Sequence, residues 1–284
     1  MALSSSTYFT IGRLSVKYLG AIFPSFVCRI VLRHWHRTFR TRSRPSEAEI
    51  FRNAYQQSLI FDGQQVMSYS WGNGKQAILL GHGWNGRAGQ FAALIPVLVD
   101  AGWKVIAFDA PGHGKSSGNS TSLVQIAGVV TAICSQHPEI KHYIGHSAGG
   151  MSGLIAQAHS MWEKPLFAKM VCIAMPRDSE WLFDLFCDAL HATPPMRIRL
   201  KKGYLEQQHM ADWHATSPIE LVKGIDTHGL LIYDDTDKGI PLEQGKTLAE
   251  NWKGSKLFVS HGYGHLRLLS SKTVIEQVRD FLKE

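Results

Sequence analysis

The chain has 284 residues, of which 44% are hydrophobic and 19% are charged, so it can bury a large core. Its four cysteines lie far apart in apolar contexts, which excludes a disulfide framework and predicts buried, reduced thiols in a cytoplasmic protein. The 14 histidines show no paired spacing on one helix, so we expect neither a metal ion nor a cofactor.

The N-terminal segment carries the excess of positive charge that gives the chain a net charge of +7. Its first 46 residues contain eight basic residues and no acidic one, whereas the rest of the chain is close to neutral. Apolar residues recur here at helical spacing, and arginines such as Arg29 and Arg33 follow another face. Pro24 is expected to begin or kink a helix. We therefore predict that residues 1–50 form a basic, amphipathic helical arm.

Two interpretations of this arm remain open. It either lies on an anionic membrane, which would make the protein peripheral to that membrane, or packs on the rest of the chain with its arginines in solvent. We favour the packed arm. The apolar stretch 18–28 is too short to span a bilayer, and no cleavage site follows it. Nucleic-acid binding is not expected, because the charge is confined to one arm and no recognition fold accompanies it.

Two glycine-containing turns follow predicted buried strands. The apolar strand 77–80 runs into Gly81-His82-Gly83-Trp84, whose backbone amides could face a reacting group. The strand 104–108 runs into the segment 109–116, which holds two glycines, a lysine and a serine without the spacing of a phosphate loop. The glycines around residue 147 also lack the spacing of a dinucleotide fingerprint, so neither segment predicts a nucleotide site.

Ser147 lies in the run Gly145-His146-Ser147-Ala148-Gly149, directly after an apolar strand. A G-x-S-x-G run between a strand and a helix is typical of a nucleophile elbow, a strained turn that exposes the serine hydroxyl. The small residues that follow predict a helix close to the sheet, with its N-terminal dipole directed at the serine. Such a serine needs a histidine base, a carboxylate that orients the histidine, and donors for an oxyanion.

Two later strand ends supply those groups. The apolar strand that ends at residue 233 runs into Asp234, Asp235 and Asp237, and a further strand is followed by His265 in a glycine loop. The candidate residues therefore come in the order Ser, Asp, His. In this order, and in its alternating strands and helices, the chain resembles the α/β-hydrolase superfamily from about residue 56 to its end.

The resemblance implies an α/β fold class, the α/β-hydrolase fold, with a mostly parallel central sheet flanked by helices. The core would comprise residues 51–174 and 226–284, beside the N-terminal helical arm. Residues 175–225 are about fifty in number, more than one crossover helix needs, and would form a helical cap insertion. Trp181 and Phe186 belong to an apolar helical face of this insertion that could line a substrate pocket.

The resemblance also implies roles for individual residues. Ser147 would be the nucleophile, His265 the general base and then acid, and Asp237 the carboxylate that orients the imidazole. The backbone amides of Trp84 and Ala148 would form the oxyanion hole.

The choice of carboxylate remains open between two aspartates. Asp237 stands four residues before Pro241, which matches the D-x-x-x-P spacing of the superfamily, and Asp235 is the alternative. Asp234 departs from the superfamily, which usually has a glycine at that place. Four other histidines are expected to be structural: His82 and His113 brace loops, His146 packs beneath the elbow, and His261 ends a strand.

Together these residues predict a serine hydrolase that cleaves a small-molecule carboxylic ester or thioester through an acyl-enzyme. The alternatives are a carbon–carbon bond hydrolase or an acyltransferase with the same triad, or a non-catalytic hydrolase-fold binding module. The module is disfavoured, because the serine, the aspartate and the histidine are all present in the required order. The natural substrate, its acyl chain length and the oligomeric state stay open.

Overall fold

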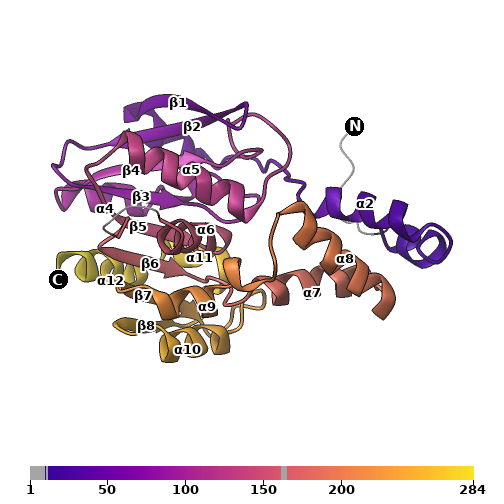
Figure 1. The fold of residues 1–284 in the computed structure, drawn as a ribbon. Helices are drawn as coiled ribbons and strands as arrows, with labels where there is room; N and C mark the ends of the chain where they lie inside the picture. Colours follow the sequence, from indigo (N-terminus) through magenta and orange to yellow (C-terminus); the bar gives the residue numbers. More distant parts are fainter. Residues whose placement is uncertain (1–9, 11, 161–164) are drawn as a thin grey trace. The chain divides into compact units, whose positions relative to one another are not determined.

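The computed structural model describes residue 10 and residues 12–160 and 165–284, and it divides the chain into two units (Figure 1). The first unit contains the described residues up to Arg37 together with Asp178–Ser217. The second unit contains Thr38–Arg177 and Pro218–Glu284. The structure therefore divides the chain at residue 37, earlier than the predicted end of the arm at residue 50.

The second unit is built on a sheet that has eight strands in the described part of the chain, in the order β1-β2-β4-β3-β5-β6-β7-β8. The pairs β1–β2 and β2–β4 are antiparallel, and all the other pairs are parallel. The expected mostly parallel sheet is thus confirmed. The strands are β1 (Tyr55–Phe61), β2 (Gln64–Trp71), β3 (Ala77–Gly81), β4 (Lys104–Asp109), β5 (Ile140–His146), β6 (Lys169–Ile173), β7 (His228–Asp234) and β8 (Ser255–Ser260).

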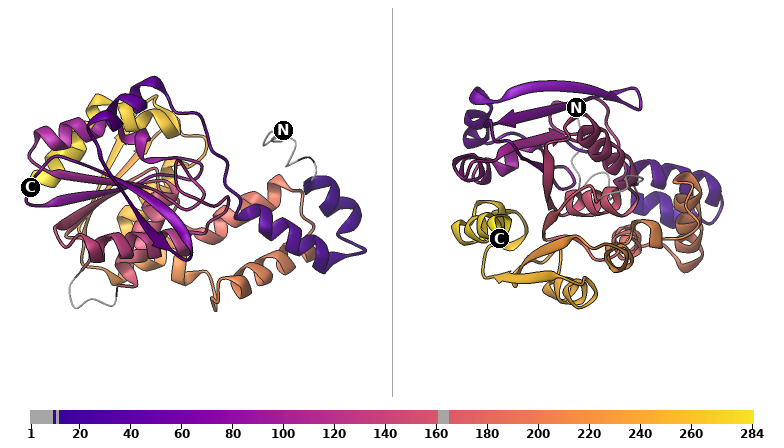
Figure 2. Two further views of the ribbon diagram at one scale, coloured as in Figure 1. Left: turned by 90° about the horizontal axis from the view of Figure 1, so that it is seen from above. Right: turned by 60° about the vertical axis from the view of Figure 1, so that its left-hand side comes forward.

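Helices cover both faces of this sheet, with α4 and α12 on one face and α5 and α6 on the other (Figure 2). Serine side chains begin two of them: Ser122 accepts the N–H of residue 125 before α5, and Ser271 accepts the N–H of residue 274 before α12. The helices of this unit are α3 (Pro45–Ile50), α4 (Leu94–Asp100), α5 (Leu123–Gln136), α6 (Ala148–Ala158), α9 (Pro218–Leu221), α10 (Leu242–Asn251), α11 (Gly264–Arg267) and α12 (Lys272–Lys283), with 3₁₀ turns at Phe51–Asn53, Ala88–Phe91, Val222–Gly224 and Leu268–Ser270.

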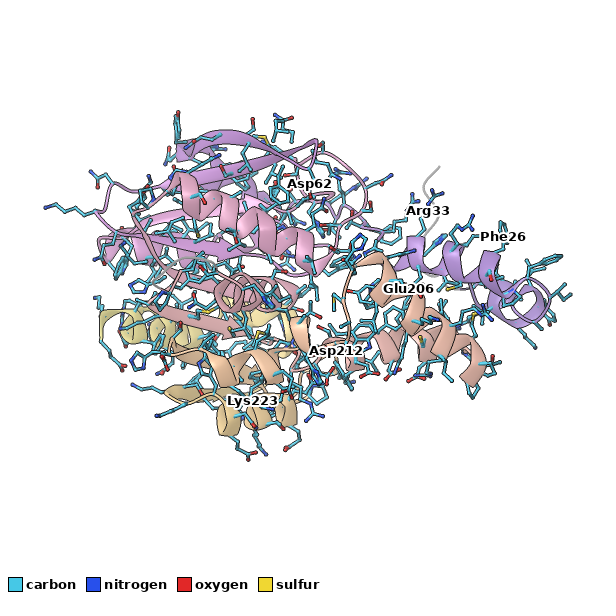
Figure 3. The ribbon with its side chains drawn as sticks, in the orientation of Figure 1. Phe26, Arg33, Asp62, Glu206, Asp212 and Lys223 are labelled. Carbon is cyan, nitrogen blue, oxygen red and sulfur yellow. The ribbon has the colours of Figure 1, made fainter. Side chains whose placement is uncertain are left out.

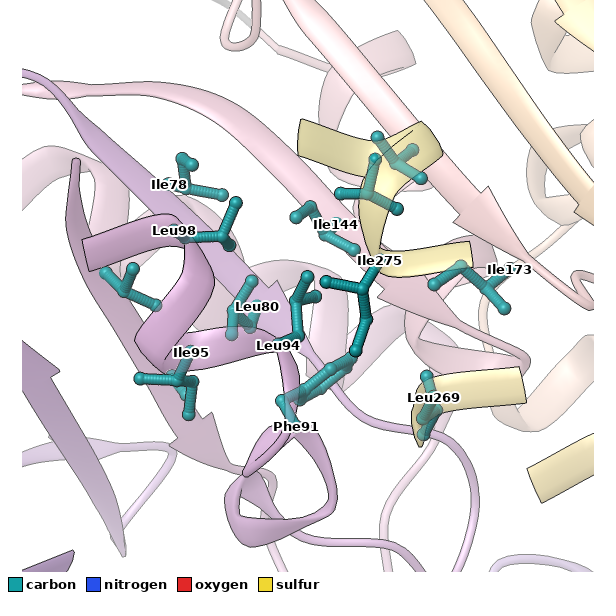
Figure 4. Packing of buried hydrophobic residues seen from close by; sticks show 14 of the residues in the cluster. Ile78, Leu80, Phe91, Leu94, Ile95, Leu98, Ile144, Ile173, Leu269 and Ile275 are labelled. Atoms are coloured by element: carbon teal, nitrogen blue, oxygen red, sulfur yellow. The ribbon is translucent and has the colours of Figure 1, made fainter. Parts of the chain in front are cut away.

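The core under α4 and α12 is built from alternate strand residues. Ile78 and Leu80 of β3 belong to this core, together with Leu94 of α4 and Ile275 of α12 (Figure 4). Leu79 points to the opposite face by the alternation of a strand, and it is also buried. Because both faces are covered there, β3 is a continuous buried apolar run, which is why it could be located from the sequence.

Buried polar contacts tie the segment after Arg37 to the sheet unit. The guanidinium of Arg87 pairs with both carboxylate oxygens of Glu47, at 2.5 and 2.8 Å. Arg40 donates to three backbone carbonyls of the loop 114–118, at 2.6 to 3.1 Å. Thr38 donates to the carbonyl of Gly112 at 2.8 Å. These contacts explain the division at residue 37, because they bind basic residues of the predicted arm to the sheet unit.

The first unit joins the rest of the arm to the segment 178–217. Pro24 begins α2, as expected, and one stripe of α2 (Val27, Cys28, Val31 and Leu32) is buried. That stripe packs on α8, where an added Cβ at Gly203 would lie 3.0 Å from Leu32. The elements of this unit are a π-helical turn (Ser15–Leu19), α2 (Pro24–Trp35), α7 (Ser179–Ala189), α8 (Pro194–Gln207) and a 3₁₀ turn (His214–Thr216).

Aromatic rings complete the core of the first unit. The ring centroids of Trp35 and Phe186 are 4.9 Å apart, and those of Trp35 and Phe183 are 5.0 Å apart. Phe186, which belongs to the helical face that could line a substrate pocket, packs against Trp35 of the arm. On α8, Arg197 and Lys201 pair with carboxylates of α7, so these two positive charges are neutralised within the unit.

Replacing Leu32 by alanine is expected to lower the free energy of unfolding by about 2–5 kcal/mol, because it opens a cavity between α2 and α8. Phe26 lies on the same helix with an exposed side chain, so Phe26→Ala should change that free energy by no more than about 0.5 kcal/mol. Urea unfolding of the full chain measures both changes. Equal effects of the two substitutions would contradict the packing of the arm.

All four cysteines, Cys28, Cys134, Cys172 and Cys187, are buried and form no disulfide. Burial raises the pKa of Cys134 and of Cys172 to about 12, so these thiols stay protonated at neutral pH. The expectation of buried thiols without a disulfide framework is confirmed.

Candidate active site

Ser147 lies at the turn between β5 and α6 in a conformation that few L-residues adopt. Its φ is 52° and its ψ is −120°, and a conformation of this kind costs about 1–3 kcal/mol unless its surroundings hold it. The Ser147 N–H donates to the carbonyl of Ile173 at 2.8 Å, and the Ser147 carbonyl accepts the N–H of Met151 at 3.2 Å. The turn thus has the strained geometry that the sequence predicts for a nucleophile elbow.

The glycines of this run are required by close approach of the backbone. An added Cβ at Gly149 would lie 2.2 Å from the carbonyl oxygen of Gly81, and one at Gly145 would lie 2.5 Å from the Cα of Gly150. Both contacts would force the backbone to move. Any larger residue at either position would therefore separate the start of α6 from the strands beneath it.

His265 and Asp237 are joined by a hydrogen bond. The Nδ1 of His265 donates to Oδ2 of Asp237 at 2.7 Å, and the Asp237 side chain is only 1% exposed. The other carboxylate oxygen accepts the amides of Gly239 and Ile240 at 2.8 and 3.0 Å. Burial alone would raise the pKa of Asp237, but the hydrogen bonds from His265 and the two amides outweigh it and lower this pKa. Asp237 is therefore ionised at neutral pH.

His146 joins the loop of His265 to the elbow. The Nε2 of His146 donates to the backbone carbonyl of His265 at 2.9 Å, and the centroids of the two rings are 4.7 Å apart. Burial lowers the pKa of His146 to about 3, so its ring is neutral. His146 packs beneath the turn, as expected. Because it directly precedes Ser147, its hydrogen bond to the backbone of His265 holds the His265 loop at the elbow.

The turn after β3 lies against the same elbow. An added Cβ at Gly83 would stand 3.2 Å from the Cβ of Ser147. Ala148 is the first residue of α6, so its amide has no partner within the helix. The amide of Trp84 donates to no acceptor among the residues that the structure describes. The amides of Trp84 and Ala148, which the sequence indicated, are therefore candidate donors to an oxyanion.

Asp235 faces a different histidine. Its Oδ2 accepts Nδ1–H of His261 at 2.8 Å, and both side chains are exposed to solvent. The hydrogen bond that His261 donates to Asp235 raises the pKa of His261. Of the two aspartates that the sequence left open, Asp237 is the one that contacts His265. His261 directly follows β8, as expected.

Asp234 organises the loop that carries His265, and the sequence did not indicate this role. Its carboxylate accepts the amides of Tyr263 and Gly264 at 3.0 and 2.9 Å and the hydroxyl of Ser260 at 2.7 Å. The side chain is fully buried. Burial alone would raise the pKa of Asp234, but the hydrogen bonds from Thr236, Gly264, Ser260 and Tyr263 hold it below its usual value. The only signal in the sequence is an aspartate where the superfamily usually has a glycine.

Replacing Asp234 by alanine is expected to lower the free energy of unfolding by about 1–3 kcal/mol, because buried donors lose their acceptor. The folded-state pKa lies below the unfolded value of about 3.9, so this contribution is present above that pH and is lost as the pH falls through the folded-state pKa. Urea unfolding at neutral and acidic pH should show the difference from wild type shrinking below about pH 4. Asp235→Ala, at an exposed position, is the control, and an equal loss there would contradict this role.

His82 and His113 brace the two loops beside the elbow. His82 bonds through Nδ1 to the carbonyl of Gly83 at 2.8 Å and accepts the amide of Ala110 on Nε2 at 3.0 Å. His113 accepts the amide of Asn85 on Nε2 at 2.9 Å. Burial lowers the pKa of His82 to about 4 and that of His113 to about 3, so both rings are neutral. The expectation that they brace loops is confirmed.

Within the described ranges, no group of three histidine, cysteine, aspartate or glutamate side chains could hold a metal ion. The chemistry available at the elbow is that of a serine hydroxyl, a histidine paired with an ionised carboxylate, and two free amides. Those are the groups required for nucleophilic attack on a carbonyl carbon.

Comparison with known proteins places this site in a family context. A family model described as the alpha/beta hydrolase fold matches residues 76–190. The chain is 32% identical over 142 residues to the dihydrolipoyllysine-residue acetyltransferase component of an acetoin cleaving system from Cupriavidus necator. That match covers 49% of this chain and 37% of the relative. The chain spans only 33% to 40% of the length of the curated relatives that it matches.

Solved structures share the fold at low sequence identity. An esterase from Exiguobacterium antarcticum has a TM-score of 0.62 at 20% identity, covering 78% of this chain and 97% of its own. A membrane phospholipase A, described as a bacterial virulence factor, has a TM-score of 0.63 at 16% identity and covers 98% of both chains. At these identities the likeness concerns the fold.

Proposed function

We propose that the chain is a serine hydrolase of the α/β-hydrolase superfamily, whose family model matches residues 76–190, and that it cleaves carboxylic esters or thioesters of small to medium size. The observation that carries the proposal is the buried, ionised Asp237 hydrogen-bonded to His265 beside the strained turn of Ser147. This arrangement fits acyl transfer, because it provides a base for the serine hydroxyl and a fixed negative charge for the imidazolium.

In the proposed reaction, Oγ of Ser147 attacks the carbonyl carbon of the ester while Nε2 of His265 takes the hydroxyl proton. The carbonyl oxygen becomes an oxyanion, which accepts hydrogen bonds from the backbone amides of Trp84 and Ala148. The carbon–oxygen or carbon–sulfur bond to the leaving group then breaks, and the imidazolium returns its proton to the departing alkoxide or thiolate. The products of this half are an acyl-enzyme and a free alcohol or thiol.

Water completes the cycle in the second half. Nε2 of His265 takes a proton from water as the water oxygen attacks the acyl carbon. The second tetrahedral intermediate then collapses, the bond from the acyl carbon to Oγ of Ser147 breaks, and the imidazolium returns its proton to Oγ, which releases the carboxylic acid and the free serine. Asp237 stays ionised throughout and stabilises the imidazolium in both halves. The N-terminus of α6 lies at the serine, so its partial positive charge also favours the oxyanion.

The relatives support an acyl-transfer reaction without defining the acceptor. The names of the two structural relatives denote an esterase and a phospholipase A, and the curated relative is called an acetyltransferase component. An acyltransferase would use the same acyl-enzyme and replace water by another nucleophile. We propose hydrolysis as the principal reaction, because water requires no second binding site.

The test is a panel of p-nitrophenyl esters of graded acyl length, run beside acyl-thioesters on the full-length chain, with fluorophosphonate labelling in parallel. We expect turnover of at least one short ester and labelling at Ser147. Faster acyl transfer to an added alcohol or thiol than to water would instead indicate an acyltransferase. Absence of turnover together with absence of labelling would contradict the proposal.

A further inference from the structure

Exposed apolar side chains are concentrated at one place in the first unit. Of the twelve large apolar side chains that are strongly exposed among the described residues, six lie between residues 14 and 26. Their exposed fractions run from 42% to 67%. Such a concentration usually marks an interaction surface, whereas single exposed apolar residues are ordinary. These six residues, called here the apolar tip, are Leu14, Tyr18, Leu19, Ile22, Phe23 and Phe26.

The apolar tip is the part of the arm that the packing of α2 leaves uncovered. Val27 and Val31 face the core of the first unit, whereas Phe26 and Arg33, seven residues apart, lie on one side of the helix (Figure 3). The turn that precedes α2 is fixed to the unit, because an added Cβ at Gly20 would lie 2.9 Å from the side chain of Met196. The tip is therefore held in place while its side chains remain in solvent.

Four positive charges that pair with no described carboxylate lie within and just after the stretch that contains the tip, and one of them, Arg13, donates to the carbonyl of Ala189 at 2.6 Å. Arg13, Lys17, Arg29 and Arg33 are all exposed, and none of the four pairs with a carboxylate in the described part of the chain. The first 46 residues contain no acidic residue that could neutralise them. Elsewhere in the same unit, Arg197 and Lys201 are neutralised by α7. The charge around the tip is thus available to an anionic partner.

We propose that the apolar tip and these four cations form a surface that docks on a bilayer containing anionic lipids. The bulky side chains would enter the boundary between headgroups and acyl chains, while the cations would meet lipid phosphates. Among the residues that the structure describes, no helix is long and apolar enough to cross a membrane. The arm thereby uses one face of α2 for packing and the other for the membrane. This inference does not rest on the proposed hydrolase activity.

Co-sedimentation of the full-length chain with vesicles tests the proposal. The protein should sediment with vesicles of phosphatidylcholine and phosphatidylglycerol at about 0.05 M salt, much less with phosphatidylcholine alone, and should be released at about 0.5 M salt. Binding that is absent, or equal for both vesicle types, would overturn the proposal. Sedimentation or dimerisation without vesicles that depends on the tip would also overturn it, since the partner would then be a second copy of the chain.

Two sets of variants assign the binding to this surface. The triple substitution Ile22→Ser, Phe23→Ser and Phe26→Ser should weaken binding by at least tenfold. Its matched control is Tyr55→Ser with Ile60→Ser on β1 of the other unit, where the exposed fractions are 67% and 71%, and this control should bind as wild type. Equal binding by the triple variant, or equal loss in the control, would overturn the proposal.

The cations are tested separately. Arg29→Gln with Arg33→Gln should weaken binding to anionic vesicles by on the order of thirtyfold, since each cation near such a surface contributes. Lys246→Gln with Lys272→Gln, at exposed positions of the sheet unit, is the control and should have no effect. The unfolding midpoint of every variant should match wild type, because none of these side chains is buried. Unchanged binding after removal of both arginines would overturn the role of charge.

Discussion

Ser147→Ala is expected to abolish turnover of every ester or thioester that the wild-type protein cleaves, with a loss on the order of a millionfold in the chemical step. The substitution removes the oxygen that forms the acyl-enzyme and leaves His265 and Asp237 in place. Alanine adopts the same positive φ at a cost similar to that of serine, so the unfolding curve should change little. Initial rates, fluorophosphonate labelling and urea unfolding measure the three consequences.

Ser152→Ala is a matched control for that experiment. Ser152 lies five residues further along the chain in α6, is fully buried, and its hydroxyl has no hydrogen-bond partner among the described residues. This variant should be labelled and should turn over substrate like wild type. Labelling of Ser147→Ala at the wild-type rate would show that the nucleophile is another residue, and the proposed function would then lose its central element.

The parts of the site that could be predicted from the sequence are those encoded by local patterns. The strand before Ser147 is buried at every position except Lys141, because both faces of a parallel sheet are covered, and its apolar Tyr143 and Ile144 could be recognised in the sequence. The glycines around the serine are required because an added Cβ would lie only 2.2 to 2.5 Å from neighbouring backbone. The residues that carry both features lie within a few positions of the serine, so a short window of sequence contains the signal, although the backbone that Gly149 approaches belongs to the distant Gly81.

The parts that could not be predicted depend on contacts between distant segments. The apolar stripe of α2 indicated burial but carried no information on its partner, and it packs on α8, about 170 residues away. The pairing of Asp235 with His261 and of Asp237 with His265 depends on how the ends of β7 and β8 align. Spacing alone could favour Asp237, whereas the role of Asp234 in holding the loop is visible only in its hydrogen bonds.

Asp237→Asn is expected to lower turnover by up to about ten-thousandfold while the protein still folds. The carboxylate accepts Nδ1–H of His265, which leaves Nε2 free to take the serine proton. An asparagine amide can donate to Nδ1 instead, and the imidazole would then carry its proton on Nε2 and could not act as base. The loss should appear in kcat and kcat/KM together, because the imidazolium exists only along the reaction path.

Asp235→Asn separates this explanation from a general effect of charge near the site. Asp235 follows the same strand and pairs with the exposed His261, so its substitution should leave turnover within a few-fold of wild type. The ionised carboxylate of Asp237 also contributes to the free energy of unfolding, because hydrogen bonds in the folded state lower its pKa. Its contribution is present above about pH 4 and is lost as the pH falls through the folded-state pKa. Comparable losses of activity in both variants, or a larger loss in Asp235→Asn, would show that Asp237 is not the carboxylate that orients His265.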